Sequence, residues 1–148
     1  MALFFRGNQA RDEIINETKN PNVHLLVCDC SLGEEVHRAW SEFQAHRRSL
    51  ISTDESAIVP LDGLICNAGA LLNEKVVTSE GVETTFATHL LFGVYTLGQL
   101  AFPSLEAVRD SRLIVVSSGG MYTVPFPAWD DATSTGIKPY GSYQLFEI

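Results

Sequence analysis

Basic residues are few in this sequence. Its 148 residues include 10 Lys and Arg against 18 Asp and Glu, for a formal net charge of −8 at pH 7. Because nucleic acids and acidic membrane surfaces repel an acidic protein, neither is expected to be the main partner. The charge balance instead favours a small molecule or another protein as the ligand.

Cysteine is also scarce, with Cys28, Cys30 and Cys66 as its three examples. An odd number of thiols in apolar runs, with no signal-peptide pattern ahead of them, is typical of a reducing compartment. We therefore predict free thiols and a cytoplasmic location. His24 shares a strand face with the first two thiols, but a Cys-x-Cys pair without a second pair is a poor zinc signature, so no metal site is predicted.

One long stretch lacks charge altogether. No Asp, Glu, Lys or Arg occurs from Thr84 to Leu105, and a helical run of that length would be able to span a bilayer. The stretch nevertheless contains His89 and Gln99. We therefore expect a buried apolar helix over residues 78–105, capped by Thr or Ser at its start, and no membrane span.

Short apolar runs alternate with amphipathic stretches along the chain. The runs predict strands, because they are bounded by turn residues, and apolar spacing of three and four positions predicts helices between them. This alternation is typical of a doubly wound α/β sheet, and the length suits a single domain over residues 1–148. The predicted strands cover residues 2–5, 22–29, 61–66 and 112–118, and the predicted helices cover residues 9–20, 32–48 and 78–105.

Polar or very small residues follow each predicted strand. Ligands of parallel sheets bind beyond the carboxyl ends of the strands, so these residues are expected to share one ligand-binding edge. Small side chains after the third strand would let the backbone approach a flat ligand, although a simple turn explains Gly69 equally well. The residues at the four strand ends are Arg6, Asp29, Asn67, Ala68, Gly69, Ser117 and Ser118.

Each of these polar residues also has a purely structural interpretation. Ser31 and Glu34 have the spacing of a capping box for the second helix, and Asp29 is favoured as a turn residue beside such a cap. Arg6 is equally expected as an exposed residue at a helix start. Ser118 is a reasonable loop-entry residue, although two Ser before two Gly at a strand end favour a site.

Three motifs together carry a family resemblance. "CDCS", "ICNAG" and "IVVSSGG" follow successive strands, and in this order they resemble the middle of the short-chain dehydrogenase/reductase (SDR) family. "VSSGGM" followed by a long Pro-containing loop is similar to the subgroup called dehydrogenase/reductase family member twelve. The resemblance implies a partial Rossmann-like parallel sheet and an NAD(P)-dependent oxidoreductase that acts on a small-molecule carbonyl or alcohol.

The resemblance also implies roles for single residues. Asp29 would meet the adenine ring, Ser118 would hydrogen-bond the substrate oxygen, and an Arg at position 6 would pair with a 2′-phosphate and favour NADP over NAD. His89 stands where the family has an Asn that holds a relay water, with one extra residue before Gly93; a satisfied core His is the alternative. The implied cofactor-binding residues are Arg6, Asp29, Asn67, Ala68 and Gly69, and the implied catalytic residues are Ser118 and Tyr143.

Two elements of the family are not found in these 148 residues. There is no glycine-rich turn of the type Thr-Gly-x-x-x-Gly-x-Gly, and Glu147 stands where the Lys of Tyr-x-x-x-Lys would follow Tyr143. A neighbouring carboxylate raises the pKa of a tyrosine, whereas a lysine lowers it. We therefore expect a chain truncated at both ends relative to the family and inactive by itself. The alternative is a non-catalytic SDR-like protein that associates with itself or with a partner through the apolar helix 78–105.

Overall fold

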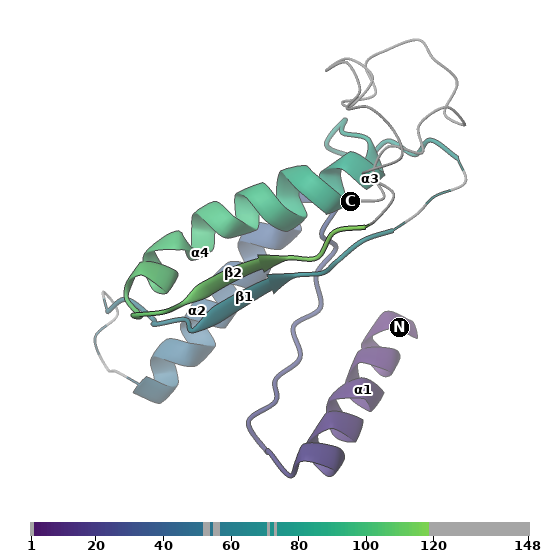
Figure 1. Ribbon diagram of the computed structural model, residues 1–148. Coiled ribbons are helices and arrows are strands. Elements are labelled where there is room, and N and C mark those ends of the chain that lie inside the picture. Colours follow the sequence, from purple (N-terminus) through teal and green to yellow (C-terminus); the bar gives the residue numbers. More distant parts are fainter. Residues whose placement is uncertain (1, 52–53, 55–56, 71, 73, 119–148) are drawn as a thin grey trace.

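The computed structural model describes residues 2–51, 54, 57–70, 72 and 74–118, so Tyr143 lies outside the described residues (Figure 1). Helices and a two-stranded parallel sheet make up this part of the chain, which confirms the α/β class. The elements in chain order are α1 (Ala2–Thr18), α2 (Gly33–Ile51), β1 (Gly63–Cys66), α3 (Thr84–Phe86), the π-helix η1 (Ala87–Thr96), α4 (Leu97–Glu106) and β2 (Arg112–Val115).

The parallel pair of strands is where the sequence prediction holds best. β1 and β2 pair in register from Gly63 opposite Arg112 to Cys66 opposite Val115. The ladder continues beyond β2, where the Val116 N–H donates to the Cys66 carbonyl at 3.0 Å. Strands predicted at residues 61–66 and 112–118 are therefore present with shorter bounds.

Helices α2 and α4 pack together on one face of this sheet (Figure 1). On that face the side chain of Leu113 in β2 lies beside Gly98 of α4, and Leu64 of β1 lies near Trp40 of α2. On β1, Ile65 instead keeps 63% of its surface exposed. Alternate residues of a strand point to opposite faces, so the sheet is covered by helices on the Leu64 side.

The prediction of one apolar helix over residues 78–105 is wrong in two respects. The helical stretch begins later, and it is divided into α3, η1 and α4. Residues 78–81 form a turn in which the Gly81 N–H donates to the Thr78 carbonyl at 3.0 Å, with φ 79° at the glycine. The helical stretch begins only after Glu83, whose carboxylate accepts from the N–H groups of Thr85 at 2.9 Å and Phe86 at 2.8 Å. Among the described residues, no helix is long and apolar enough to cross a membrane.

The middle of this helical stretch is a π-helix that requires glycine at position 93. A Cβ atom at this position would clash with the carbonyl oxygen of Thr88, so only glycine fits the backbone. Thr96 supports the same wide winding, because its hydroxyl donates to the Leu91 carbonyl five residues earlier at 2.8 Å. π-helical turns are rare and frequently occur at functional sites.

The two predicted strands nearest the N-terminus are both wrong. Residues 2–5 belong to α1, which ends at Thr18, close to the predicted helix end. Residues 22–29 run without regular structure, and in the part of the chain that the structure describes they share no ladder with β1 or β2. A strand is stabilised by its hydrogen-bonded neighbour, so an apolar run without one stays a single segment.

Helix α2 confirms the predicted helix over residues 32–48, but its first turn is capped differently. The Ser31 N–H and hydroxyl both donate to the Asp29 carboxylate, at 2.9 and 2.7 Å. The N–H groups of Gly33 and Glu34 donate instead to the carboxylate of Glu80, at 2.9 and 3.1 Å. The predicted Ser31–Glu34 capping box is therefore replaced by a carboxylate from a distant part of the sequence.

Candidate functional site

Two of the predicted motifs meet at one edge of the sheet. Residues 67–69 leave the carboxyl end of β1 and residues 117–118 leave that of β2, and the two ends are in register because Cys66 lies opposite Val115. Asn67 is exposed and Ser118 is half-buried. The edge therefore brings the exposed Asn67 and the half-buried Ser118 together from two strands.

The third polar member of this edge is His89 from η1. The Ala70 N–H donates to its Nε2 atom at 2.8 Å, and the same nitrogen lies 3.0 Å from the Ala70 carbonyl oxygen. Neutral imidazole accepts at one nitrogen and donates at the other, so the tautomer decides which of the two bonds forms. His89 thus holds the backbone that follows the Asn-Ala-Gly turn, and its relay role stays a prediction.

The same contact explains the glycine of the turn. A Cβ atom on Gly69 would lie 2.7 Å from Cε1 of His89, closer than real side-chain contacts allow. The imidazole therefore occupies the space that a side chain would need. Gly69 is small because the protein's own His89 approaches it, whereas the exposed Asn67 and Ala68 remain open to a ligand.

The sequence predicted that all four strand ends share one edge of the sheet. Asp29 and Arg6 do not lie at this edge. Asp29 ends a segment outside the sheet, and its carboxylate accepts from Ser31, as the turn interpretation predicts. Arg6 lies inside helix α1 and is exposed, so it follows no strand. The premise of the NADP preference is therefore wrong, and contacts of either residue with a dinucleotide stay predictions.

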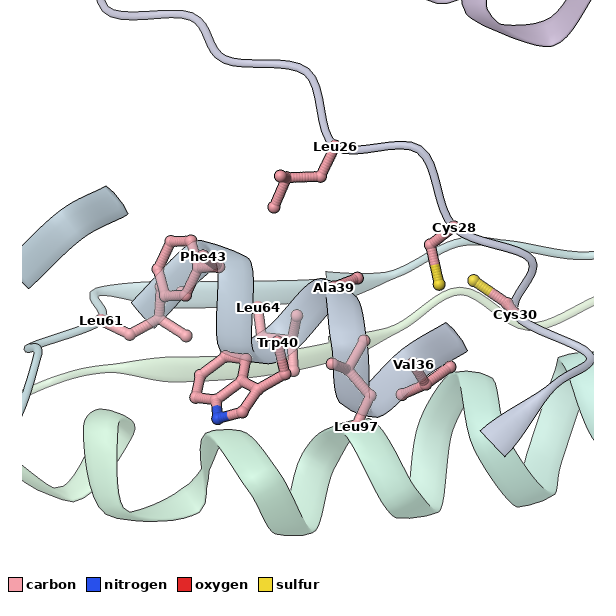
Figure 2. A pocket seen from close by; sticks show the side chains of 11 residues that line it. Leu26, Cys28, Cys30, Val36, Ala39, Trp40, Phe43, Leu61, Leu64 and Leu97 are labelled. Carbon is pink, nitrogen blue, oxygen red and sulfur yellow. The ribbon is translucent and has the colours of Figure 1, made fainter. Parts of the chain in front are cut away.

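An apolar groove of about 340 Å³ separates residues 26–30 from β1 and α2. Cys28 and Cys30 lie on one wall with their sulfur atoms toward each other, and Trp40 and Leu64 lie on the other (Figure 2). Burial, followed by the neighbouring Cys30, raises the pKa of the Cys28 thiol to about 12. Burial also raises the pKa values of Cys30 and Cys66. All three cysteines are free thiols that stay protonated at neutral pH.

Sequence reasoning missed two residues that hold this part of the chain together. Arg38 donates to the Val27 carbonyl at 2.7 Å and pairs with Glu35 at 2.7 Å and Glu42 at 2.6 Å, so it ties the segment 22–29 to α2. This hydrogen bonding lowers the pKa of Glu35. The i,i+3 and i,i+4 spacing of these charges was a readable signal. Glu80 had none, because it caps a helix that begins 47 residues earlier.

Within the described ranges, no group of three or more His, Cys, Asp or Glu side chains is arranged to hold a metal ion. The polar groups at the Asn67 and Ser118 edge are neutral hydrogen-bonding groups. Such an edge orients an uncharged ligand oxygen or ring through hydrogen bonds.

No family model matches the chain, but several curated proteins do. It is 38% identical over 116 residues to bovine (Bos taurus) Dehydrogenase/reductase SDR family member 12, covering 78% of the chain and 32% of that protein. The human protein of that name is 37% identical over 115 residues, with the same coverage. Human WW domain-containing oxidoreductase is 31% identical over 113 residues, covering 76% of the chain and 24% of that protein. The chain spans about a third of the length of the first two relatives.

Proposed function

We propose, on the premise that this chain is homologous to short-chain dehydrogenase/reductase proteins, that it supplies part of the active site of an oxidoreductase. The relatives are named as dehydrogenases, reductases or oxidoreductases, which supports this general activity. The finer proposal is that the complete protein transfers hydride between NAD(P) and a small-molecule carbonyl or alcohol. The described residues would then be a segment of one Rossmann-like parallel sheet.

The observation that carries the proposal is the register of β1 and β2. This register brings residues 67–69 and residues 117–118 to the same carboxyl edge, where ligands of parallel α/β sheets bind. The exposed Asn67 and Ala68 leave backbone and amide groups open to a flat ring, and Ser118 follows β2 at the same edge. Two motifs that are 48 positions apart in the sequence thus form one polar edge.

In the proposed reaction Ser118 donates a hydrogen bond to the substrate oxygen and stabilises the negative charge that develops there. The turn at residues 67–69 lines the cofactor cleft, and His89 fixes the backbone that follows it. When bound, NAD(P)H would supply the hydride for reduction of a carbonyl. Tyr143 is the proposed proton donor, and Asp29 the proposed contact of the adenine; the choice between NADP and NAD stays open because Arg6 lies in a helix.

A segment exchange tests this proposal. In bovine Dehydrogenase/reductase SDR family member 12, the 116 matched residues are replaced by those of this chain, and binding of NADPH and NADH is measured by fluorescence. We expect saturable binding and reduction of at least one carbonyl compound in a panel. Ser118→Ala should lower kcat/KM by about 10²-fold and leave the dinucleotide Kd unchanged, because one oxyanion donor is lost.

Ser117→Ala is the matched control, since it removes the same group from the adjacent residue, which is exposed. A folded exchange protein, verified by a cooperative thermal transition, that binds neither dinucleotide would refute the proposal. Equal losses for Ser117→Ala and Ser118→Ala would refute the role of Ser118.

We do not propose association through one continuous apolar helix over residues 78–105. Residues 78–83 lie outside the helix, and a π-helix interrupts the rest. The predicted cytoplasmic location and the predicted oligomer stay predictions. The proposed partner is a small molecule.

A further inference from the structure

A second cavity, which shares no lining residue with the proposed active-site edge, gathers most of its polar groups from two Arg and two His side chains. It has a volume of about 500 Å³ and lies between α1, residues 23–26 and the second half of α2. Arg11, His24, His46 and Arg47 line it, together with Glu42.

One basic side chain of this cavity has no carboxylate partner among the described residues. Arg11 is paired with Asp12 at 2.7 Å, and Glu42 shares Arg38 with Glu35, at 2.6 and 2.7 Å. Arg47 is half-buried and makes no ion pair with a described residue. Arg47 is therefore the lining guanidinium that is not held by a described carboxylate, in a chain whose net charge is −8.

The two imidazoles supply the second observation. The rings of His24 and His46 lie 4.1 Å apart between centroids, and Nε2 of His46 is buried with no hydrogen-bond partner among the described residues. A buried polar nitrogen without a partner is unfavourable, and a hydrogen-bond acceptor that reaches it would satisfy it. The N–H groups of Arg and His are donors of the kind that oxyanions accept.

The remaining lining is apolar. Val23, Leu26 and Phe43 complete the cavity, so a ligand with a charged end and an apolar body would match both parts of the surface. Arginine binds phosphate and carboxylate groups through two parallel N–H···O bonds, which gives both strength and orientation.

We propose that this cavity, which we call the Arg47 cavity, binds a small organic oxyanion. Its phosphate or carboxylate group accepts hydrogen bonds from Arg47 and from the imidazole of His46, and its apolar part packs against Phe43. The site is separate from the proposed oxidoreductase edge and does not depend on that function.

The test is an NMR titration of the 148-residue protein with inorganic phosphate, phenyl phosphate and benzoate. The signals followed are the Cε1–H groups of His24 and His46 and the side-chain N–H of Arg47. We expect saturable shifts, with phenyl phosphate binding about tenfold more tightly than inorganic phosphate because it adds a buried ring. Tighter binding of benzoate than of phenyl phosphate would identify a carboxylate as the preferred group.

Two variants separate a specific site from general attraction to positive charge. Arg47→Gln should weaken binding of phenyl phosphate about tenfold, because the charge-assisted bonds are lost. Arg109→Gln is the matched control, since the side chain of Arg109 is 96% exposed. Its Nε atom lies as far as 3.8 Å from the Oδ2 atom of Asp110, so the ion pair is weak. His46→Phe keeps a ring beside His24 and removes Nε2, so it should also weaken binding while the melting temperature shows that the protein is folded.

Shifts that do not saturate, or equal weakening by Arg47→Gln and Arg109→Gln, would overturn the proposal. The proposal would also be overturned if folded His46→Phe and Arg47→Gln proteins both bound phenyl phosphate with unchanged affinity. Each outcome is independent of dinucleotide binding, so failure here leaves the proposed oxidoreductase function untouched.

Discussion

Two apolar runs of this chain, residues 22–29 and residues 61–66, look alike in sequence and differ in structure. Both end in a thiol-containing stretch and both predict a buried strand. The second forms β1, because β2 lies beside it and completes a parallel ladder. The first has no described strand beside it and is held by side chains. An apolar sequence favours a strand, but the strand forms only where a neighbouring strand is hydrogen-bonded to it.

The means by which each run is held follow from this difference. Residues 22–29 are attached through the bond from Arg38 to the Val27 carbonyl and through Leu25, whose side chain packs against Gly7 of α1. β1 is attached through backbone hydrogen bonds and through the helices that cover Leu64 and Leu113. The second arrangement leaves its carboxyl end fixed in register with β2, as a binding edge requires.

The largest effect is expected in the helical layer that covers β1. Gly93→Ala places a Cβ against the Thr88 carbonyl oxygen, so the π-helix must shift, and we expect a loss of about 3 kcal/mol in the free energy of unfolding. Gly98→Ala is the matched control, because the nearest atom to its Cβ is Leu113 Cδ2 at 3.7 Å. Alanine should stabilise that helix by about 0.5–1 kcal/mol. Urea unfolding of both variants measures the difference, and equal stabilities would contradict the assignment of the π-helix.

Amide hydrogen exchange compares the two runs directly. The Val116 N–H donates to the Cys66 carbonyl, whereas the described hydrogen bonds include none from the N–H of Leu26. We expect the Val116 amide to exchange about 10²-fold more slowly than the Leu26 amide. Similar protection at both amides would mean that residues 22–29 pair with another strand in solution.

A smaller effect is expected at the start of α2. Glu80→Ala removes the acceptor of the Gly33 and Glu34 N–H groups, which should lower the free energy of unfolding by about 1–2 kcal/mol. Glu106→Ala, at an exposed position at the end of α4, is the control and should change stability little. If both substitutions changed the free energy of unfolding by the same small amount, the cap from Glu80 would not stabilise α2.

The thiol of Cys28, inside the unpaired run, is expected to react slowly. The pKa of Cys28 is raised to about 12, so at pH 8 only about one molecule in 10⁴ carries the thiolate that reacts. Iodoacetamide should therefore modify Cys28 more slowly in the folded protein than in urea, and its rate should keep rising with pH up to about 11. Mass spectrometry of timed samples measures this rate. Equal rates in the folded and unfolded protein would show that residues 26–30 are open to solvent.

Short sequence patterns predicted the elements that depend mainly on residues close to them in the sequence. The ends of β1 and α1 were readable because turn residues follow them, and α2 was readable from its apolar spacing. Whether residues 22–29 pair depends on strands elsewhere, and Glu80 reaches α2 from 47 residues away, so neither had a local signal. At the candidate site the sequence predicted that Asn67 and Ser118 share an edge, but it did not reveal that His89 is the reason for Gly69.

The most direct test of the central claim is a dinucleotide titration followed by backbone NMR on the exchange protein that carries this chain. The account predicts that NADPH or NADH shifts the amide signals of residues 67–70 and 116–118 together, with one Kd, because β1 and β2 present them at one edge. Dinucleotide binding that leaves both sets of signals unchanged, or shifts them with different Kd values, would contradict the account.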